Sequence, residues 1–224
     1  MLIISAKTPT QNLSIKRSMS KLFQSFLYTH LPSKEHKGYT SKSGKTFKAM
    51  NFFITYKENS FDILFTALDE KYEQIIALEI LKNGLKIGEI HTSSTTVEIV
   101  KRDIGSDVKE IEAQGYICAS IKNPLTKRKI FLEPGDNRHT KIITNHSLQK
   151  YETLLGTTYD KDFEITPLWQ SYKSITFWYE KTPYTAWKAR YIIKTDSSMI
   201  NLLLKTGLGG DSMKNMGFLE VVKK

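Results

Sequence analysis

The first half of the chain alternates between helix-like and strand-like patterns of apolar residues. Apolar positions three or four residues apart predict an amphipathic helix over residues 14–28, and Pro32 would end it. A second helix is expected between a cap at Asp69 and a glycine stop at Gly84. Apolar and β-branched runs predict strands at residues 2–6, 47–56, 61–67, 86–91 and 97–100. The predicted order is β-α-β-β-α-β.

The second half repeats this order more loosely. Helices are expected over residues 145–155, capped by Asn145, and over 197–204. Strands are expected at residues 116–121, 129–132, 174–179, 185–193 and 217–222, the first two as a hairpin around Asn123 and Pro124. Two such units predict an α+β protein with two tandem ferredoxin-like domains and antiparallel sheets, residues 1–112 and 113–224.

Charge adds a partner to this picture. The 224 residues include 33 Lys and Arg against 23 Asp and Glu, a net charge of +10 that favours polyanions. Net charge alone does not separate nucleic acid from an anionic membrane. Membrane binding calls for a basic amphipathic helix with bulky apolar residues on its other face, and the sequence has no such segment standing apart from the fold. Nucleic acid is therefore the preferred partner, and no membrane partner is predicted.

Other sequence features indicate the compartment and the kind of site. No apolar run approaches the roughly 18 residues that cross a bilayer, and the apolar opening turns polar too soon for a signal peptide. The single cysteine, Cys118, cannot form an internal disulfide, so a cytoplasmic protein is expected. It lies in an apolar run and is expected to be a small core residue. The five histidines show no metal-ligand spacing, so neither a metal site nor another cofactor is predicted.

The polar segment after the first predicted helix combines positive charge with histidine. Five lysines from Lys34 to Lys48 accompany a single acid, Glu35. Histidine has an unperturbed pKa of about 6.5 and exchanges a proton near neutral pH. Such a group suits RNA cleavage: a base takes the ribose 2′-OH proton, the oxygen attacks the adjacent phosphorus, and an acid protonates the leaving 5′-oxygen. A solvated loop histidine is the alternative.

Three further segments are candidates for phosphate contact. A glycine-rich segment near the C-terminus contains Gly207, Gly209, Gly210, Lys214 and Gly217, and glycine lets backbone N–H groups approach a phosphate. It lacks the Gly-Lys-Ser/Thr of a Walker loop, and a flexible connection with a helix stop is the alternative. The other two segments are basic: Lys188 and Arg190 on one face of a predicted strand, and Lys127, Arg128 and Lys129 on the predicted hairpin. Solvated edge charge is the alternative for both.

The C-terminal segment resembles a known family. It reads Leu-Leu-Leu-Lys-Thr-Gly-Leu-Gly over residues 202–209 and, after a spacer, Met-Gly-Phe over 216–218. This is similar to the CRISPR repeat-processing endoribonucleases, members of the repeat-associated RNA-binding superfamily that ends in a glycine-rich loop. The spacer is longer here, and Leu219 stands where the last glycine is common. The resemblance implies tandem ferredoxin-like domains and metal-independent cleavage of precursor CRISPR RNA within each repeat, to release guide RNAs.

The resemblance also implies residue roles. The family's catalytic histidine follows the first helix, where His36 fits best and His30 is the second candidate. Tyr28 would orient the RNA or donate a proton, and Lys45 or Lys42 would stabilise the charged phosphorane. The expected RNA-binding residues are Lys37, Lys42, Lys127, Arg128, Lys129, Lys188, Arg190, Gly207, Gly209, Gly210, Lys214 and Gly217.

The implied partners are CRISPR repeat RNA and a CRISPR surveillance complex, with the chain a monomer or a homodimer. Two alternatives remain open. One is a non-catalytic RNA-binding subunit of such a complex, and the other is a basic adaptor for an acidic protein or a membrane surface. A pure phosphate-binding adaptor would bind RNA with a steep salt dependence and no sequence preference.

Overall fold

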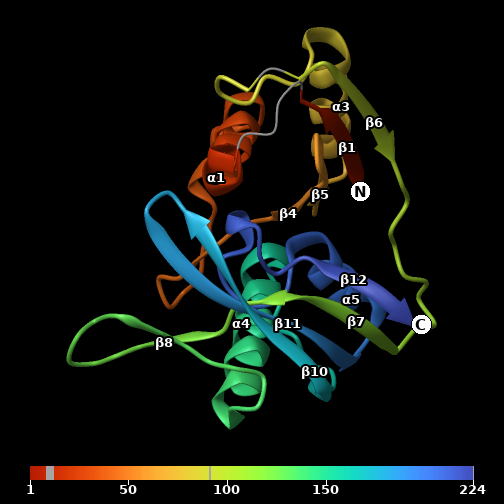
Figure 1. Ribbon diagram of the computed structural model, residues 1–224. Helices are drawn as coiled ribbons and strands as arrows, with labels where there is room; N and C mark the ends of the chain where they lie inside the picture. The colour runs from red at the N-terminus through yellow and green to blue at the C-terminus, as the bar shows by residue number, and fades with distance from the viewer. Residues whose placement is uncertain (9–12, 91, 224) are drawn as a thin grey trace.

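A computed structural model describes residues 1–8, 13–90 and 92–223. The N-terminal half contains a four-stranded antiparallel sheet in the order β4-β5-β1-β6. Helices α1 and α3 connect its strands, and a short helix and hairpin lie between α1 and β4 (Figure 1). The elements are β1 (Leu2–Lys7), α1 (Leu13–His30), α2 (Ser33–Lys37), β2 (Tyr39–Thr40), β3 (Thr46–Phe47), β4 (Met50–Tyr56), β5 (Ser60–Ala67), α3 (Lys71–Asn83) and β6 (Ser94–Ile99).

The C-terminal half repeats the arrangement. Its four-stranded sheet has the order β10-β11-β7-β12, again with antiparallel neighbours, and the β8–β9 hairpin is inserted after the first strand. The elements are β7 (Glu110–Ile117), β8 (Ser120–Lys122), β9 (Lys129–Phe131), α4 (Asn137–Leu155), β10 (Glu164–Tyr179), β11 (Thr182–Lys194), α5 (Ser197–Thr206), a 3₁₀ turn η1 (Ser212–Lys214) and β12 (Leu219–Lys223). The predicted tandem ferredoxin-like fold is confirmed.

The apolar periodicity explains how each half forms its core. In β1 the alternate residues Leu2, Ile4 and Ala6 are buried, as expected for a strand with one face against a helix. The apolar stripe of α1 covers that face, and its Phe23 packs edge-on against Phe52 of β4 with ring centroids 5.1 Å apart. The second half builds a separate core by the same rule.

Some predicted elements are wrong or begin elsewhere. The predicted strand at residues 86–91 is absent from the described part, residues 86–90, which holds only an isolated bridge between Ile87 and Ile90; His91 lies outside the described residues. Helix α4 begins two turns before Asn145, because the Asp136 side chain caps it by accepting a hydrogen bond from the Arg138 backbone N–H at 2.8 Å.

Strand β7 is longer than predicted. It begins at Glu110, and its residues Ile111, Ala113 and Ile117 alternate in burial, so the predicted hairpin strand over residues 116–121 is divided between β7 and β8. We retain the two domains, residues 1–112 and 113–224, as a proposal, although that division falls inside β7.

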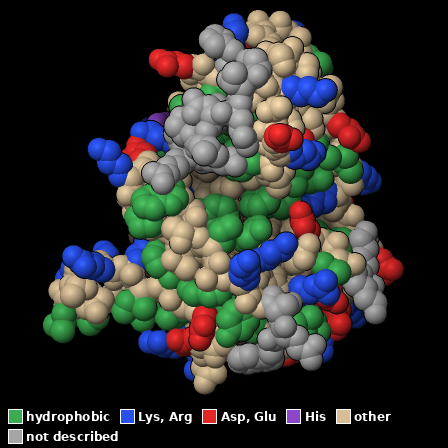
Figure 2. Space-filling model, viewed as in Figure 1, with side chains coloured by type: hydrophobic (Ala, Val, Ile, Leu, Met, Phe, Trp, Pro, Cys, Tyr) green, Lys and Arg blue, Asp and Glu red, His purple; other side chains and the backbone are tan. Residues whose placement is uncertain are grey.

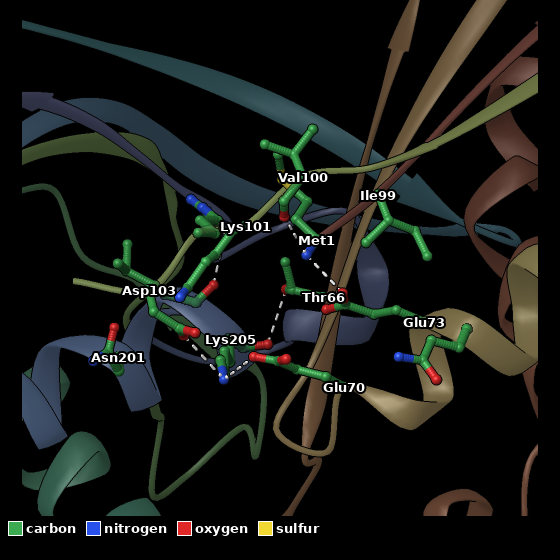
Figure 3. Close-up of a pocket in the computed structure, with 13 residues that line it drawn as sticks. Met1, Thr66, Glu70, Glu73, Ile99, Val100, Lys101, Asp103, Asn201 and Lys205 are labelled. Carbon is green, nitrogen blue, oxygen red and sulfur yellow. Dashed lines mark hydrogen bonds and ion pairs between the residues drawn. The ribbon is translucent and has the colours of Figure 1, made fainter. Parts of the chain in front are cut away.

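Polar contacts join the two halves. Lys205 of α5 forms ion pairs with Glu70 at 2.8 Å and with Asp103 at 3.1 Å, beside a cavity of about 370 Å³ (Figure 3). In the same region the Thr66 hydroxyl donates to the Lys205 carbonyl at 2.9 Å. Further along the interface, the Asn215 side-chain carbonyl accepts from the Ile54 backbone N–H at 2.5 Å. These contacts hold α5 and η1 against the N-terminal sheet.

Candidate nucleic-acid interface and active site

A sharp turn brings the segment after α2 back against β3. Gly38 has φ +82°, and a Cβ atom there would lie 2.7 Å from the Phe47 carbonyl oxygen, so only glycine fits without displacement. The β2–β3 hairpin then returns the chain beside α2, with Tyr39 paired to Phe47. This turn places Lys48, the residue after β3, next to α2.

Three side chains meet at the end of α1. The His36 ring stacks on the Tyr28 ring with centroids 4.4 Å apart and an angle of 26° between the planes. The Lys48 ammonium lies 5.0 Å from the centroid of the Tyr28 ring and donates to the backbone carbonyls of Glu35, at 3.2 Å, and of His36. His36 is exposed. Tyr28 and His36 therefore lie together as the sequence predicted, with a lysine beside them.

The Tyr28 hydroxyl group is held in its neutral form. Burial raises the pKa of Tyr28 to about 12, so near neutral pH the group keeps its proton and acts as a hydrogen-bond donor rather than a base. Its oxygen accepts a hydrogen bond from the Gln24 side-chain amide at 3.2 Å. Burial also lowers the pKa of Lys48, an effect that the Glu35 carboxylate opposes.

The predicted lysines occupy other places. Lys45 lies over the Phe47 ring at 5.6 Å, and that ring packs edge-on against His146 of α4 at 4.9 Å. Lys42 pairs with Glu152 of α4 at 2.6 Å. The structure thus brings Lys48, rather than Lys45 or Lys42, to Tyr28 and His36. No local sequence signal separates Lys48 from Lys45, because the position of Lys48 depends on the pairing of β2 with β3.

The remaining described histidines have other surroundings. The His30 ring packs against the Phe26 ring at an angle of 52°, with centroids 4.6 Å apart, and faces Glu79 of α3, with Nδ1 and a carboxylate oxygen 3.8 Å apart. His139 is fully buried, and its two ring nitrogens lie within hydrogen-bond distance of the Leu132 carbonyl and the Tyr191 hydroxyl. Burial, together with Lys150 and Lys45, lowers the pKa of His146 to about 2.

The glycine-rich loop packs inside the protein. Gly207, Gly209 and Gly217 are buried, and the N–H groups of Gly207, Gly210 and Gly217 donate to the carbonyls of Leu203, Cys118 and Tyr116 at 2.8, 2.9 and 2.8 Å. The buried Lys150 ammonium donates to the Thr206 and Gly207 carbonyls, and burial lowers the pKa of that lysine to about 7. Contact of these glycines with RNA stays a prediction, and three of the N–H groups are already used within the protein.

The packing of this loop allows a stability test. Gly217 has φ +82°, and a Cβ atom there would lie 2.7 Å from the Leu208 carbonyl oxygen. Gly156 has a similar φ of +77° with no atom within 4 Å of such a Cβ, so it is the matched control. We expect Gly156→Ala to lower the free energy of unfolding by about 1 kcal/mol and Gly217→Ala to lower it by about 3 kcal/mol. Urea unfolding measures both, and equal losses would contradict the packing role.

The exposed edge of the loop carries a charged cluster. The Asp211 carboxylate pairs with Lys129 of β9 at 2.8 Å and with Lys214 at 2.7 Å, and both lysines lie over the Tyr184 ring. Burial would raise the pKa of Asp211, but the two lysines outweigh it and hold that pKa below its usual value. The cluster keeps one excess positive charge. Cys118 lies beneath it, and burial raises the pKa of that thiol to about 12, so the predicted core cysteine is confirmed.

Strand β11 presents the predicted basic face. Lys188 and Arg190 are exposed whereas Ala189 and Tyr191 between and beyond them are buried, which confirms the predicted alternation. Arg190 pairs with Glu112 of β7 at 3.2 Å. Lys127 and Arg128 extend from the exposed β8–β9 loop, and Lys37 is exposed at the end of α2.

An aromatic-lined cavity of about 430 Å³ lies between the two sheets. Phe53 of β4 stacks on Tyr116 of β7 at 5.3 Å, and Tyr116 meets Phe177 of β10 edge-on at 5.4 Å. The Lys188 ammonium is 5.8 Å from the Tyr116 ring centroid. Apolar side chains gather in the hollow across the middle of the molecule, with Lys and Arg nearby (Figure 2).

The described residues contain neither a cluster of metal ligands nor a membrane-spanning helix. Within residues 1–8, 13–90 and 92–223, no three His, Cys, Asp or Glu side chains are grouped so that they would hold a metal ion. Over the same described residues, no helix is both long enough and apolar enough to span a bilayer.

Comparison with known proteins identifies the C-terminal half. Residues 116–221 match the family model of the CRISPR associated protein Cas6, C-terminal. This segment of the chain is therefore similar to the C-terminal domain of the Cas6 proteins. No curated protein sequence matches the chain.

Three solved structures share the fold of this chain over nearly its whole length. A CRISPR associated protein Cas6 has a TM-score of 0.71 at 11% identity, covering 99% of this chain and 98% of its own. A Cas6 product complex has a TM-score of 0.70 at 13% identity, with the same coverage. A RAMP protein binding different RNA substrates has a TM-score of 0.69 at 15% identity and covers 100% of both chains. At these identities the likeness shows the fold.

The Cas6 match covers one part of the candidate interface and omits the other. It includes β11, the glycine-rich loop and Tyr116, whereas Tyr28, His36 and Lys48 precede it in the chain. The family-model match therefore bears on the C-terminal surface, and the case for the N-terminal cluster rests on its own geometry.

Proposed function

We propose that the chain is a metal-independent endoribonuclease that cuts precursor CRISPR RNA within its repeats and releases guide RNAs. The observation that carries this proposal is the stacking of exposed His36 on Tyr28 beside the Lys48 ammonium. The match of residues 116–221 to the Cas6 C-terminal family model supports it, as does the likeness in fold to a Cas6 product complex and to a RAMP protein that binds different RNA substrates.

The cluster contains the groups that such a cleavage needs. His36 takes the proton of the ribose 2′-OH as the 2′-oxygen attacks the adjacent phosphorus. The bond from phosphorus to the 5′-oxygen breaks, and the protonated His36 returns the proton to that leaving oxygen. Tyr28, which keeps its proton, donates a hydrogen bond to the phosphate. The Lys48 ammonium stabilises the extra negative charge of the phosphorane. The products are a 2′,3′-cyclic phosphate and a 5′-hydroxyl.

The RNA is proposed to follow the basic surface around the aromatic cavity. Lys188 lies beside Tyr116 and Arg190 is two residues further along β11, so phosphates would meet the cations while an unpaired base stacks on an aromatic ring. Further proposed contacts are Lys37, Lys42, Lys127, Arg128, Lys129 and Lys214. We propose that processed RNA then passes to a CRISPR surveillance complex.

Removing both β11 cations should weaken RNA binding at low salt and flatten its salt dependence. The Lys188→Ala/Arg190→Ala variant is expected to reduce the slope of log K against log salt concentration by about 1 to 2, because each lost phosphate contact removes roughly 0.7 to 0.9. The control is Lys71→Ala/Lys82→Ala on α3, which removes the same charge elsewhere. Filter binding at several salt concentrations measures both. A slope unchanged from the wild type in the β11 variant would place the RNA elsewhere.

The function is tested by incubating purified protein with labelled CRISPR repeat RNA in excess EDTA and analysing the product ends. We expect one cut per repeat, with a cyclic phosphate on the upstream fragment. Tight binding without a cut would favour the non-catalytic RNA-binding subunit. Binding that is weak at physiological salt and indifferent to sequence would favour the basic adaptor.

A further inference from the structure

The tip of the β10–β11 hairpin contacts α1, far away in the sequence. The two strands extend from the C-terminal sheet toward α1 (Figure 1). At the tip Glu180 forms an ion pair with Lys21, and the Tyr179 hydroxyl donates to the side-chain carbonyl of Gln24. One turn further along α1, the Gln24 amide nitrogen donates to the Tyr28 hydroxyl at 3.2 Å. These hydrogen bonds lead from the hairpin tip directly to the candidate active site.

The charges around Tyr179 fix the direction of these hydrogen bonds. Burial raises the pKa of the Tyr179 hydroxyl, and Glu180 adds to this effect. Lys214, whose ammonium lies 5.3 Å from the Tyr179 ring centroid, and Lys21 oppose it. Lys214 has the largest effect of these charges, and a hydroxyl group beside a cation is favoured with its oxygen toward the cation and its hydrogen away. That hydrogen therefore points at Gln24, whose carbonyl accepts it.

The orientation of Gln24 then determines what Tyr28 does. An amide whose oxygen accepts from Tyr179 turns its nitrogen toward Tyr28, and that nitrogen can only donate. The Tyr28 oxygen is thus occupied as an acceptor, and its own hydrogen stays free. If the amide were reversed, Tyr28 would donate to Gln24 and its hydrogen would be unavailable to a ligand.

We propose that Gln24 and Tyr179 are positioning residues that keep the Tyr28 hydroxyl hydrogen free to bond the phosphate at His36. This inference rests on the proposed function. It makes the C-terminal hairpin a part of the N-terminal site, because the orientation at Tyr28 is set by a residue 151 positions later in the chain.

The test is a double-mutant cycle on the single-turnover rate of repeat RNA cleavage. Tyr179→Phe removes the hydroxyl but keeps the ring beneath Lys214, and Gln24→Met removes both hydrogen bonds at similar volume. Each is expected to slow cleavage about three- to ten-fold without changing the RNA Kd, as for the loss of one oriented hydrogen bond. In a Tyr28→Phe background neither change should slow cleavage further. The matched control is Tyr151→Phe, which loses a hydroxyl contact with Ser198 elsewhere.

The other outcomes separate failure of this inference from failure of the proposed function. Equal slowing by Tyr179→Phe in the wild-type and Tyr28→Phe backgrounds would mean a merely structural role and would overturn the inference. Wild-type rates in both Tyr179→Phe and Gln24→Met, with Tyr28→Phe slow, would overturn it and leave the proposed function standing. A wild-type protein that binds repeat RNA without cutting it would overturn the proposed function and this inference together.

Discussion

Replacing His36 by alanine is expected to slow repeat RNA cleavage by at least about 100-fold while the RNA Kd stays within about twofold. General acid–base catalysis by a positioned side chain is worth about 10² to 10⁴ in rate. His36 is exposed and its ring stacks on Tyr28, so its removal disturbs little packing. Single-turnover cleavage and filter binding on the same preparation separate the two effects.

The matched control for His36→Ala is His30→Ala, which replaces the histidine at the end of α1. His30 packs against Phe26 and faces Glu79, so its loss should leave the cleavage rate near that of the wild type. The opposite pattern, with His30→Ala inactive and His36→Ala active, would move the catalytic role to His30. Full activity in both variants would remove histidine from the mechanism.

Lys48→Ala is expected to slow cleavage by about 100-fold, the effect of removing one group that stabilises charge in a transition state. The lysine also supports α2 through its bonds to the Glu35 and His36 carbonyls, so thermal unfolding should be followed in parallel. Lys48→Arg, which keeps the charge, should recover part of the rate. A rate that falls only in proportion to the loss of folded protein would mean a structural role.

Comparing Lys45→Ala with Lys48→Ala tests which lysine stabilises the phosphorane: Lys48, as the structure indicates, or Lys45, as the sequence predicted. Lys45 lies against Phe47 on the side of α4. We therefore expect the Lys45→Ala variant to cleave RNA at least about tenfold faster than the Lys48→Ala variant. If Lys45→Ala lowered the cleavage rate more than Lys48→Ala, Lys45 would be the lysine that stabilises the phosphorane, and the proposed role of Lys48 would be contradicted.

Periodicity predicted the elements that bury a clear apolar face. The helix through Met19 and Phe23 and the alternation around Lys188 and Arg190 follow directly from residue spacing. Helix α4 began earlier than expected because its first turns are polar and their cap, Asp136, is recognised by a hydrogen bond rather than by an apolar pattern. The sequence alone did not separate β7 from β8, because both lie in one apolar run.

The site depended on contacts that spacing does not encode. Tyr28 and His36 are close in sequence, and the resemblance to a known family found both. The choice of Lys48 over Lys45 required the geometry of the Gly38 turn and the β2–β3 hairpin. The contact of Tyr179 with Gln24 joins residues 155 positions apart, and no local pattern predicts it. The glycine-rich loop stands out in the sequence by its composition, but the burial of its glycines follows only from the tertiary packing.

The most direct test of the central claim uses repeat RNAs with a single 2′-deoxy substitution at each position in turn, incubated with the protein in excess EDTA. We expect one cut that survives EDTA. It should disappear with one substitution, at the nucleotide before the cut, because the 2′-oxygen of that nucleotide is the nucleophile. A cut that persists in every substituted RNA, or that EDTA abolishes, would contradict metal-independent cleavage through the 2′-hydroxyl.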